Sequence, residues 1–353
     1  MTDQKITFGK KKRVLLIYTV ALEYRIPFFS VLGEQVELTV SHSGQRMTDG
    51  CAGFNELILS CHRFWRFQFQ KDLRGIIKER EFDAIIFFMD ISWASTVLNF
   101  LFPPIRTRRI IWGLWRTGSL LPDIVRVWLA KKAEFNVFYS QGAARDFVRL
   151  GVPFRRISVA NNTFRVVSPH RNESSVRDSI IVVGSFNARK RNDVTLSAFI
   201  ASAAQSSIRL VFIGDGPEKE HIESIARQSS LASQIEFHAA CHDEAILHAF
   251  YDRAICSVSN SQAGLSVLQS FAFGVPFVTS RDAISGGEIE NIKHLENGWL
   301  TDGSQEGLTE ALKSLIDNPD LASSLGRSAL NYYRSFASIE HMVAGMMRAI
   351  VEN

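Results

Sequence analysis

The chain has 353 residues, of which 46% are hydrophobic and 22% are charged. This length exceeds the size at which one hydrophobic core stops growing, so we expect a globular protein with two domains. The most apolar stretch, residues 83–104, contains Asp83, Asp90 and Asn99 and ends in two prolines, which excludes a membrane-spanning helix there. Four cysteines without close metal-site spacing predict free thiols in a reducing cytoplasm.

The charge is unevenly distributed along the chain. Residues 1–172 carry 26 Lys and Arg against 14 Asp and Glu, whereas the remaining residues carry 14 against 22. Such asymmetry predicts two domains with different partners. The basic, Phe- and Trp-rich first half suits an anionic surface, which could be membrane lipid, a lipid-phosphate acceptor or nucleic acid. Because no nucleic-acid-binding motif is recognisable, we expect no nucleic-acid partner.

In the first half, short apolar runs alternate with helical patterns. Strands are expected at 14–22, 36–42, 83–90, 108–115, 136–140 and 156–163, and helices at 24–32, 94–102 and 141–151.

The basic aromatic segment 62–80 predicts a strand or loop followed by an amphipathic helix. Its aromatic residues Phe64 and Trp65 stand beside Arg63 and Arg66, a combination that suits the interface of an anionic membrane. A half-buried strand with solvated arginines is an equally good interpretation.

In the second half the same alternation returns after a polar stretch. We expect a first domain at 1–168, a linker at 169–178, a second domain at 179–334 and a C-terminal segment at 335–353 that crosses back to the first domain. Strands alternating with helices predict parallel sheets covered on both faces, and therefore two doubly wound α/β domains with ligands at the carboxyl ends of the strands.

The stretch Ser257–Ser280 combines a strand end, a glycine-containing loop and a helix start. The N-terminus of a helix offers N–H groups without intrahelical partners, and glycine lets the backbone approach a ligand, so this stretch can hold a phosphate. An ordinary buried strand–loop–helix fits the residues equally well.

Four blocks of the second half resemble the retaining glycosyltransferases of family 4, which have a GT-B fold. The blocks read VVGSFNARKRNDVTLSAF, LVFIGDGPEKEHIESIA, SNSQAGLSVLQSFAFGVPFVTS and GGEIENIKHLENGWLTDGS. They cover about residues 178–330, in the order and at the spacing of that family. The resemblance implies two Rossmann-like domains facing a central cleft, with the nucleotide sugar bound by the second domain.

The resemblance also implies roles for individual residues. Lys190 matches the lysine that neutralises the donor diphosphate as it leaves, and Arg189 can assist it. The backbone of Gly184 would lie close to the donor, and the turn Gly214 to Gly216 would lie near the nucleoside. Amides presented to the diphosphate would come from Gly264, Leu265 and Ser266.

The chain departs from the family pattern in its sugar pocket. At the positions of the two glutamates that the family carries there, this chain has Ser261 and Gln269. Of these two residues, only Gln269 can still bond the ribose, through its amide. Gln262 and Glu288 are possible substitutes for the missing sugar contact. Ser185 stands where relatives carry an arginine, which removes one positive charge from the phosphate site.

On the acceptor side the resemblance is looser. Candidates are Tyr24 and Arg25 after the first strand, Asp90 at a strand end and Arg116 near the end of the strand 108–115. For Asp90, a strand-end cap is the favoured alternative. No metal site and no cofactor are expected, because this fold binds the donor diphosphate without a divalent ion.

Together these features predict a glycosyltransferase that moves a sugar from a UDP- or GDP-linked donor to a lipid-linked or oligosaccharide acceptor, with retention, in surface polysaccharide biosynthesis. We expect the protein in the cytoplasm, where it could also bind peripherally to the cytoplasmic face of the inner membrane. Two alternatives remain, a non-catalytic binding partner that has kept the fold and a nucleotide-sugar epimerase of the same architecture.

Overall fold

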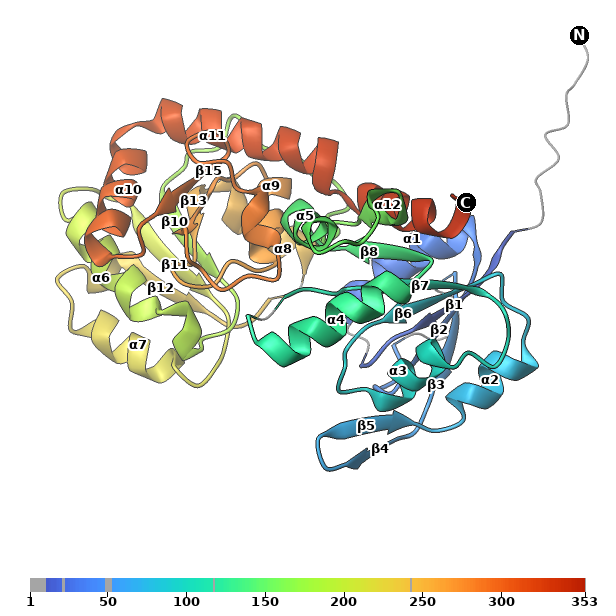
Figure 1. Ribbon diagram of the computed structural model, residues 1–353. Helices are drawn as coiled ribbons and strands as arrows, with labels where there is room; N and C mark the ends of the chain where they lie inside the picture. Colours follow the sequence, from blue (N-terminus) through green and yellow to red (C-terminus); the bar gives the residue numbers. More distant parts are fainter. Residues whose placement is uncertain (1–10, 21–22, 48–52, 117, 242, 353) are drawn as a thin grey trace, which may run out of the picture. The chain divides into compact units, whose positions relative to one another are not determined.

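The structure is a computed structural model that describes residues 11–20, 23–47, 53–116, 118–241 and 243–352. The chain forms two compact units (Figure 1): unit 1 comprises Met1–Asn161 and Ile339–Asn353, and unit 2 comprises Asn162–Ser338. The sequence prediction placed a linker at 169–178, but these residues belong to unit 2. The C-terminal helix α12 (Ile339–Val351) belongs to unit 1.

Unit 1 is built on a parallel sheet whose strands are rich in apolar, β-branched residues. Runs such as VLLI and AIIFF are apolar without alternation, which is typical of strands buried on both faces. In spatial order the sheet contains β3 (Asn55–Ile58), β2 (Glu37–His42), β1 (Arg13–Ile17), β6 (Ala84–Phe88), β7 (Arg108–Trp112), β8 (Phe135–Phe138) and β9 (Ile157–Val159).

Helices cover both faces of this sheet. Successive strand residues point to opposite faces, so Val14 and Leu16 pack on one side and Leu15 and Ile17 on the other. The first side is covered by α1 (Ile26–Gln35) and α12. The second side is covered by α2 (Leu73–Glu79), α3 (Ala94–Leu101), α4 (Leu120–Lys132) and α5 (Gln141–Arg149).

Three elements of unit 1 differ from the sequence prediction. The segment 62–80 contains an antiparallel hairpin, β4 (Cys61–Phe64) and β5 (Phe67–Gln70), ahead of α2. Trp65 in its turn has a left-handed backbone with φ +54°. Strand β3 and helix α4 were not predicted, because two of the four residues of β3 are polar and α4 is apolar around most of its circumference.

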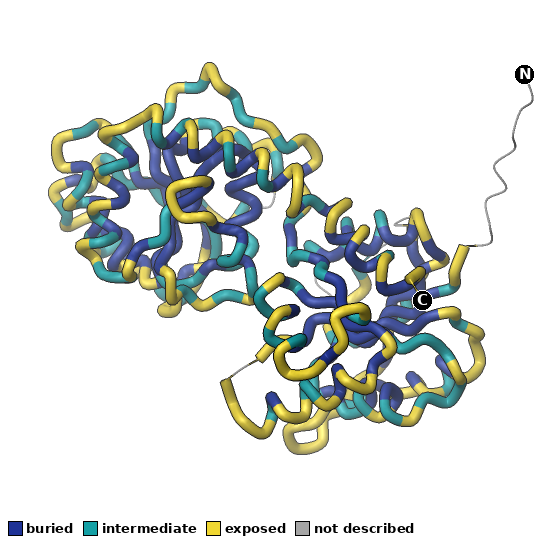
Figure 2. The backbone as a smooth tube through the Cα atoms, turned by 45° about the horizontal axis from the view of Figure 1, so that its top comes forward, coloured by how far each residue is buried: buried dark blue, intermediate teal, exposed yellow. Residues whose placement is uncertain are grey.

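Unit 2 repeats the architecture with a second parallel sheet. In spatial order it contains β12 (Ile235–His238), β11 (Arg209–Ile213), β10 (Ser179–Val183), β13 (Ala254–Val258), β14 (Phe277–Ser280) and β15 (Gly298–Thr301). One face is covered by α6 (Asn192–Ala203), α7 (Lys219–Arg227), α10 (Gln305–Asp317) and α11 (Pro319–Tyr332). The other carries α8 (Glu244–Asp252) and α9 (Ser266–Ala272). In each unit the buried residues lie in the interior, and the exposed ones lie at the periphery (Figure 2).

Both sheets contain a point at which the strand order reverses. In unit 1 the chain proceeds from β1 to β2 and β3 on one side and continues with β6 on the other. In unit 2 it proceeds from β10 to β11 and β12, and continues with β13 on the other side. Loops that leave such strands in opposite directions open a crevice at the carboxyl edge, where α/β proteins bind ligands. The loops after β10 and β13 are therefore the first place to look for a site in unit 2.

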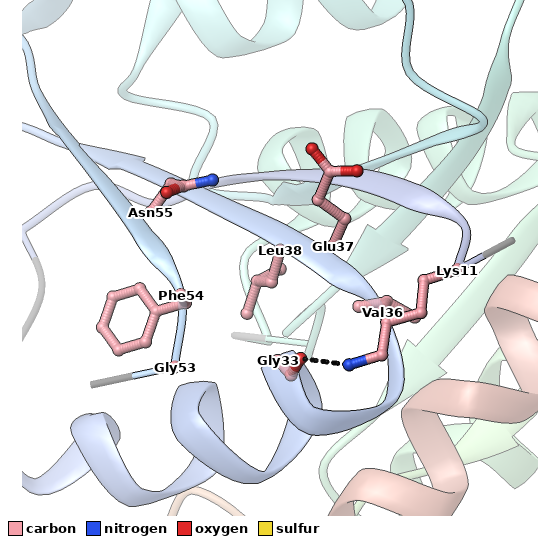
Figure 3. A pocket seen from close by; sticks show the side chains of 8 residues that line it. All are labelled: Lys11, Gly33, Val36, Glu37, Leu38, Gly53, Phe54 and Asn55. Atoms are coloured by element: carbon pink, nitrogen blue, oxygen red, sulfur yellow. Dashed lines mark hydrogen bonds between the residues drawn. The ribbon is translucent and has the colours of Figure 1, made fainter. Parts of the chain in front are cut away.

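Figure 3 shows a hollow of about 410 Å³ at the opposite, amino-terminal edge of the unit 1 sheet. Glu37 and Asn55 are the first residues of β2 and β3, and the Lys11 ammonium group donates to the Gly33 carbonyl across 3.5 Å. This position at the amino ends of the strands separates the hollow from the ligand-binding edge.

Candidate functional site

The loop after β10 is held in shape by its own side chains. The Asn187 side-chain oxygen accepts from the Arg189 backbone N–H at 3.1 Å, and the Asn187 Nδ2 donates to Ser185 Oγ at 2.8 Å. These bonds fold Ala188–Lys190 into a 3-10 turn, which ends at Arg191 in a left-handed conformation, φ +48°. The turn directs Lys190 back toward the end of β10, whereas Arg189 and Ser185 remain exposed.

Lys190 is a buried lysine. It is 8% exposed, and its ammonium group donates to the Val183 carbonyl at 3.1 Å. Burial lowers the pKa of Lys190 to about 8, and among the described residues no carboxylate offsets this effect. A Cβ at position 184 would collide with the ammonium nitrogen, so Gly184 makes room for the lysine. A buried cation with only a carbonyl partner is well suited to receive an anion.

The glycine turn after β11 is packed against the same loop. A Cβ on Gly214 would collide with the Gly184 carbonyl oxygen, and one on Gly216 with the Phe186 carbonyl oxygen. The Phe186 N–H donates to the Asp215 carbonyl at 2.9 Å, which joins the two loops. The carboxylate of Asp215 accepts from the Ala240 N–H at 2.7 Å and from Lys219 at 2.8 Å, and these bonds lower the pKa of Asp215. Both glycines are therefore required for backbone contact.

The loop after β13 is fixed by the loop after β14. The Ala263 N–H donates to the Ile284 carbonyl and the Ile284 N–H to the Ser261 carbonyl, both at 2.9 Å. Gln262 Oε1 is buried and has no hydrogen-bond partner among the described residues. The space around a Cβ at Gly264 is open, in contrast to that at Gly214. Leu265 and Ser266 then begin α9, so this loop places backbone amides and one unpartnered amide oxygen at the carboxyl edge.

Gln269 lies in α9 and is buried. Its side-chain oxygen accepts from the Tyr251 hydroxyl at 3.3 Å. An amide oxygen has two lone pairs, so Gln269 can still accept a second bond at this oxygen and can donate from Nε2.

Glu288 is a buried carboxylate with three donors. It accepts from Asn162 Nδ2 at 2.6 Å, from the Gly286 N–H at 2.9 Å and from Ser285 Oγ at 3.1 Å. Asn162 was not among the residues that the sequence singled out, but the structure makes it a partner of Glu288. No local pattern could have revealed this pair, because 126 residues separate its members.

In unit 1, Arg25 lies within a cluster of aromatic side chains. It is 2% exposed, donates to the Tyr139 hydroxyl at 2.9 Å, and stacks over the rings of Tyr24 and Trp112 at 4.9 and 5.3 Å. Burial lowers the pKa of Arg25, but the neighbouring tyrosines outweigh it and the net pKa is raised. The guanidinium therefore stays charged, and no carboxylate among the described residues pairs with it.

The other two acceptor-side candidates are engaged locally. Asp90 Oδ1 accepts from the Ser92 N–H at 2.9 Å and from the Ser92 hydroxyl at 2.7 Å. Asp90 therefore caps the end of its strand, which is the interpretation that the sequence favoured. Arg116 forms an ion pair with Asp123 at 3.6 Å, at the start of α4. Tyr24, Arg25 and Asp90 thus follow β1 and β6 at the strand-order reversal of unit 1, while Arg116 belongs to the surroundings of α4.

Within the described ranges, no cluster of His, Cys, Asp or Glu could hold a metal ion. In the same residues no helix is long and apolar enough to cross a membrane. The cysteines Cys61, Cys241 and Cys256 are free thiols, while Cys51 lies outside the described residues.

Comparison with known proteins places this site in a family context. The model of the family described as glycosyl transferases, group 1, matches residues 168–332, which include every candidate residue of unit 2. N-acetyl-alpha-D-glucosaminyl L-malate synthase of Bacillus anthracis is 26% identical over 161 residues, or 45% of this chain and 42% of that protein. The lipopolysaccharide core biosynthesis glycosyltransferase LpsE of Rhizobium meliloti (strain 1021) is 27% identical over 175 residues, or 48% of this chain and 50% of that protein. The chain thus spans about half the length of the curated relatives it matches.

The fold as a whole also has solved counterparts. The Anabaena protein HepE in complex with UDP superimposes with a TM-score of 0.72 at 13% identity, covering 97% of this chain and 100% of that one. The predicted GT-B class, with two Rossmann-like α/β units, is confirmed. The match to the family model lies within unit 2.

Proposed function

We propose that this chain is a retaining glycosyltransferase of family 4 that transfers a hexose or related sugar from a UDP- or GDP-linked donor. The acceptor is a lipid-linked or growing glycan in surface polysaccharide biosynthesis. The observation that carries this proposal is the buried ammonium group of Lys190 at the strand-order reversal of unit 2, inside the region matched by the family model. The LpsE relative and the UDP complex of HepE support the class of donor and acceptor.

In this proposal Lys190 stabilises the leaving diphosphate. Charge develops on the diphosphate as the bond to the sugar breaks, and a cation in a poorly solvated position stabilises such charge more strongly than one in water. The departing phosphate receives the acceptor proton, so no nucleophilic side chain is needed and the protein contributes orientation. Arg189, which is exposed beside Lys190, adds positive charge at the rim.

Two sets of groups then hold the donor, the backbone amides that bind its diphosphate and the side chains that contact its sugar. The amides of Gly264, Leu265 and Ser266 bind the diphosphate, since first-turn amides have no acceptor within their own helix. Ser261, Gln262 and Glu288 replace the usual glutamate contacts to the sugar. The three donors on Glu288 fix its carboxylate in one orientation, which preorganises it for hydroxyl groups. The donor binds without a metal ion, because the lysine and the amides supply the positive charge.

Unit 1 is proposed to contact the acceptor and the membrane. Tyr24 and Arg25 lie at its ligand-binding edge, and the hairpin β4–β5 presents exposed Phe64 and Trp65 at its tip. With Arg63 and Arg66 beside them, these rings suit a peripheral contact with the anionic cytoplasmic face of the inner membrane.

A nucleotide panel tests this proposal directly. The thermal unfolding midpoint is measured with UDP, GDP, ADP and their sugars, followed by mass spectrometry of donor hydrolysis and of transfer to lipid-linked acceptors. We expect one nucleoside diphosphate to raise the midpoint and its sugar to be consumed. A protein that no nucleotide stabilises would instead be a non-catalytic member of the fold.

A further inference from the structure

Helix α4 carries an apolar face that no other described element of unit 1 covers. Its inner side packs Leu129 and Ala130 into the core. On its outer side Leu120 and Leu121 are 76% and 75% exposed. The same side also presents Ile124, Val125 and Trp128 to solvent. Positions separated by one, four, five and eight residues form one stripe along a helix, and a stripe of this kind marks an interaction site.

Basic side chains border this stripe, and two of them neutralise the negative charge of Asp123. Asp123 is buried and pairs with Arg126 at 3.3 Å and with Arg116 at 3.6 Å. Lys131 and Lys132 follow in the last turn. The surface therefore combines exposed aliphatic side chains with a net positive charge.

Aromatic residues connect the apolar stripe to these cations. Trp115, which is exposed ahead of α4, has the Arg126 guanidinium 5.8 Å from its ring centre. Trp128 has the Lys132 ammonium group 5.9 Å from its ring centre. Amphipathic rings with a cation beside them are typical of side chains at a membrane–water interface.

A groove of about 420 Å³ runs beside the stripe. Its lining combines the apolar side chains of Leu120, Ile124, Val127, Trp128 and Leu150 with the charged side chains of Arg116, Asp123 and Lys131. Hydrocarbon suits the apolar side chains of this lining, and because arginines neutralise Asp123, a phosphate group suits its cations. This pairing is the chemistry of an anionic phospholipid.

We propose that α4, together with Trp115, lies in the interface of an anionic phospholipid bilayer, with its axis in the membrane plane. Burial of the stripe supplies the apolar part of the binding energy, and the four basic residues add attraction to negatively charged headgroups. This inference deepens the proposed function, because it names the surface that brings the protein to a lipid-linked acceptor. It is separate from the hairpin, whose exposed rings belong to a different part of unit 1.

Vesicle sedimentation with the full chain tests the proposal without any requirement for transfer. Vesicles of phosphatidylglycerol and phosphatidylethanolamine are compared with vesicles of phosphatidylcholine. We expect the combined variant Leu121→Gln, Ile124→Gln and Trp128→Gln to lose about tenfold or more in partitioning to the anionic vesicles. Lys131→Gln with Lys132→Gln should lose about tenfold and reduce the salt dependence. The matched control is Ile225→Gln with Ile246→Gln, which removes exposed apolar side chains of unit 2 and should bind as the wild type does.

Three outcomes would overturn the proposal. One is wild-type protein that shows no preference for anionic vesicles, and another is an α4 triple variant that binds them as well as wild type. The third is a wild-type dimer that the triple variant dissociates without any change in vesicle binding, which would assign the stripe to a second copy of the chain. Thermal unfolding of each variant checks its folding. A lack of nucleotide stabilisation in wild type would count against the proposed function and leave the vesicle result intact.

Discussion

The side-chain amide of Asn162 donates to the Glu288 carboxylate at 2.6 Å, joining the first residues of unit 2 to the loop after β14. The other two donors to this carboxylate come from its own loop, so Asn162 is its long-range anchor. A buried carboxylate held in this way keeps one orientation, which is what a contact to a sugar hydroxyl requires.

Glu288→Gln should therefore impair both stability and donor use. The new amide nitrogen would face hydrogen-bond donors, so unfolding should become easier by about 1–3 kcal/mol. If Glu288 also contacts the sugar, KM for the donor should rise and kcat should fall, as measured by steady-state kinetics. Asn162→Ala is the control, because it removes one donor and leaves the carboxylate. Unchanged KM and kcat in Glu288→Gln would exclude the sugar contact.

Replacing Lys190 should separate catalysis from folding. Lys190→Met removes the proposed diphosphate ligand and also relieves the desolvation of a buried ammonium group, so transfer should be lost while thermal stability is retained or increased. Arg189→Gln, at an exposed neighbour, should reduce kcat only a few-fold. A Lys190→Met enzyme that still transfers sugar at the wild-type rate would rule out the phosphate role.

The pH dependence of donor binding should report the same lysine. The pKa of Lys190 is lowered to about 8, so the ammonium form predominates at pH 7 and is lost as the pH rises through 8. A bound diphosphate favours the charged form, so the affinity for UDP or GDP should fall by up to about tenfold per pH unit above 8. Calorimetric titration between pH 7 and 9.5 measures this slope. In Lys190→Met the slope should disappear, and a slope that persists would point to another group.

Two glycines should differ in their sensitivity to the same substitution. Gly214→Ala places a Cβ against the Gly184 carbonyl, so the two loops have to separate and both stability and donor affinity should fall. Gly264→Ala meets open space in the loop after β13 and should leave stability within about 0.5 kcal/mol of wild type. Denaturant unfolding compares the two variants. Equal effects would mean that the contact between the loops after β10 and β11 is not rigid.

The sequence was informative where chemistry depends on short segments. Strands such as AIIFF and the block around Lys190 are recognisable because apolar runs and a glycine–lysine spacing are local patterns. Burial of Lys190 was missed, because it follows from the 3-10 turn set by Asn187 and not from the identity of its neighbours. The pair of Asn162 and Glu288 was missed because it forms only after the sheet has assembled. Helix α4 was missed because its outer face is apolar, so the usual alternation of apolar and polar sides is absent.

Stability at mildly acidic pH should depend on His248. His248 in α8 stacks on His170 with ring centres 4.1 Å apart, and its Nδ1 lies 3.4 Å from Asp252. Burial lowers the pKa of His248. Asp252 and Glu244 oppose this shift and His170 adds to it, and the net pKa of His248 is lowered from 6.5.

Because the unfolded chain protonates His248 more readily than the folded chain does, its contribution to stability is present above pH 6.5 and is lost as the pH falls below it. Urea unfolding at pH 7.5 and at pH 5.5 should show a decrease that His248→Gln makes smaller. His221→Gln, at an exposed histidine on α7, is the matched control and should leave the decrease as it is in wild type. A decrease of the same size in His248→Gln would locate the acid-sensitive group elsewhere.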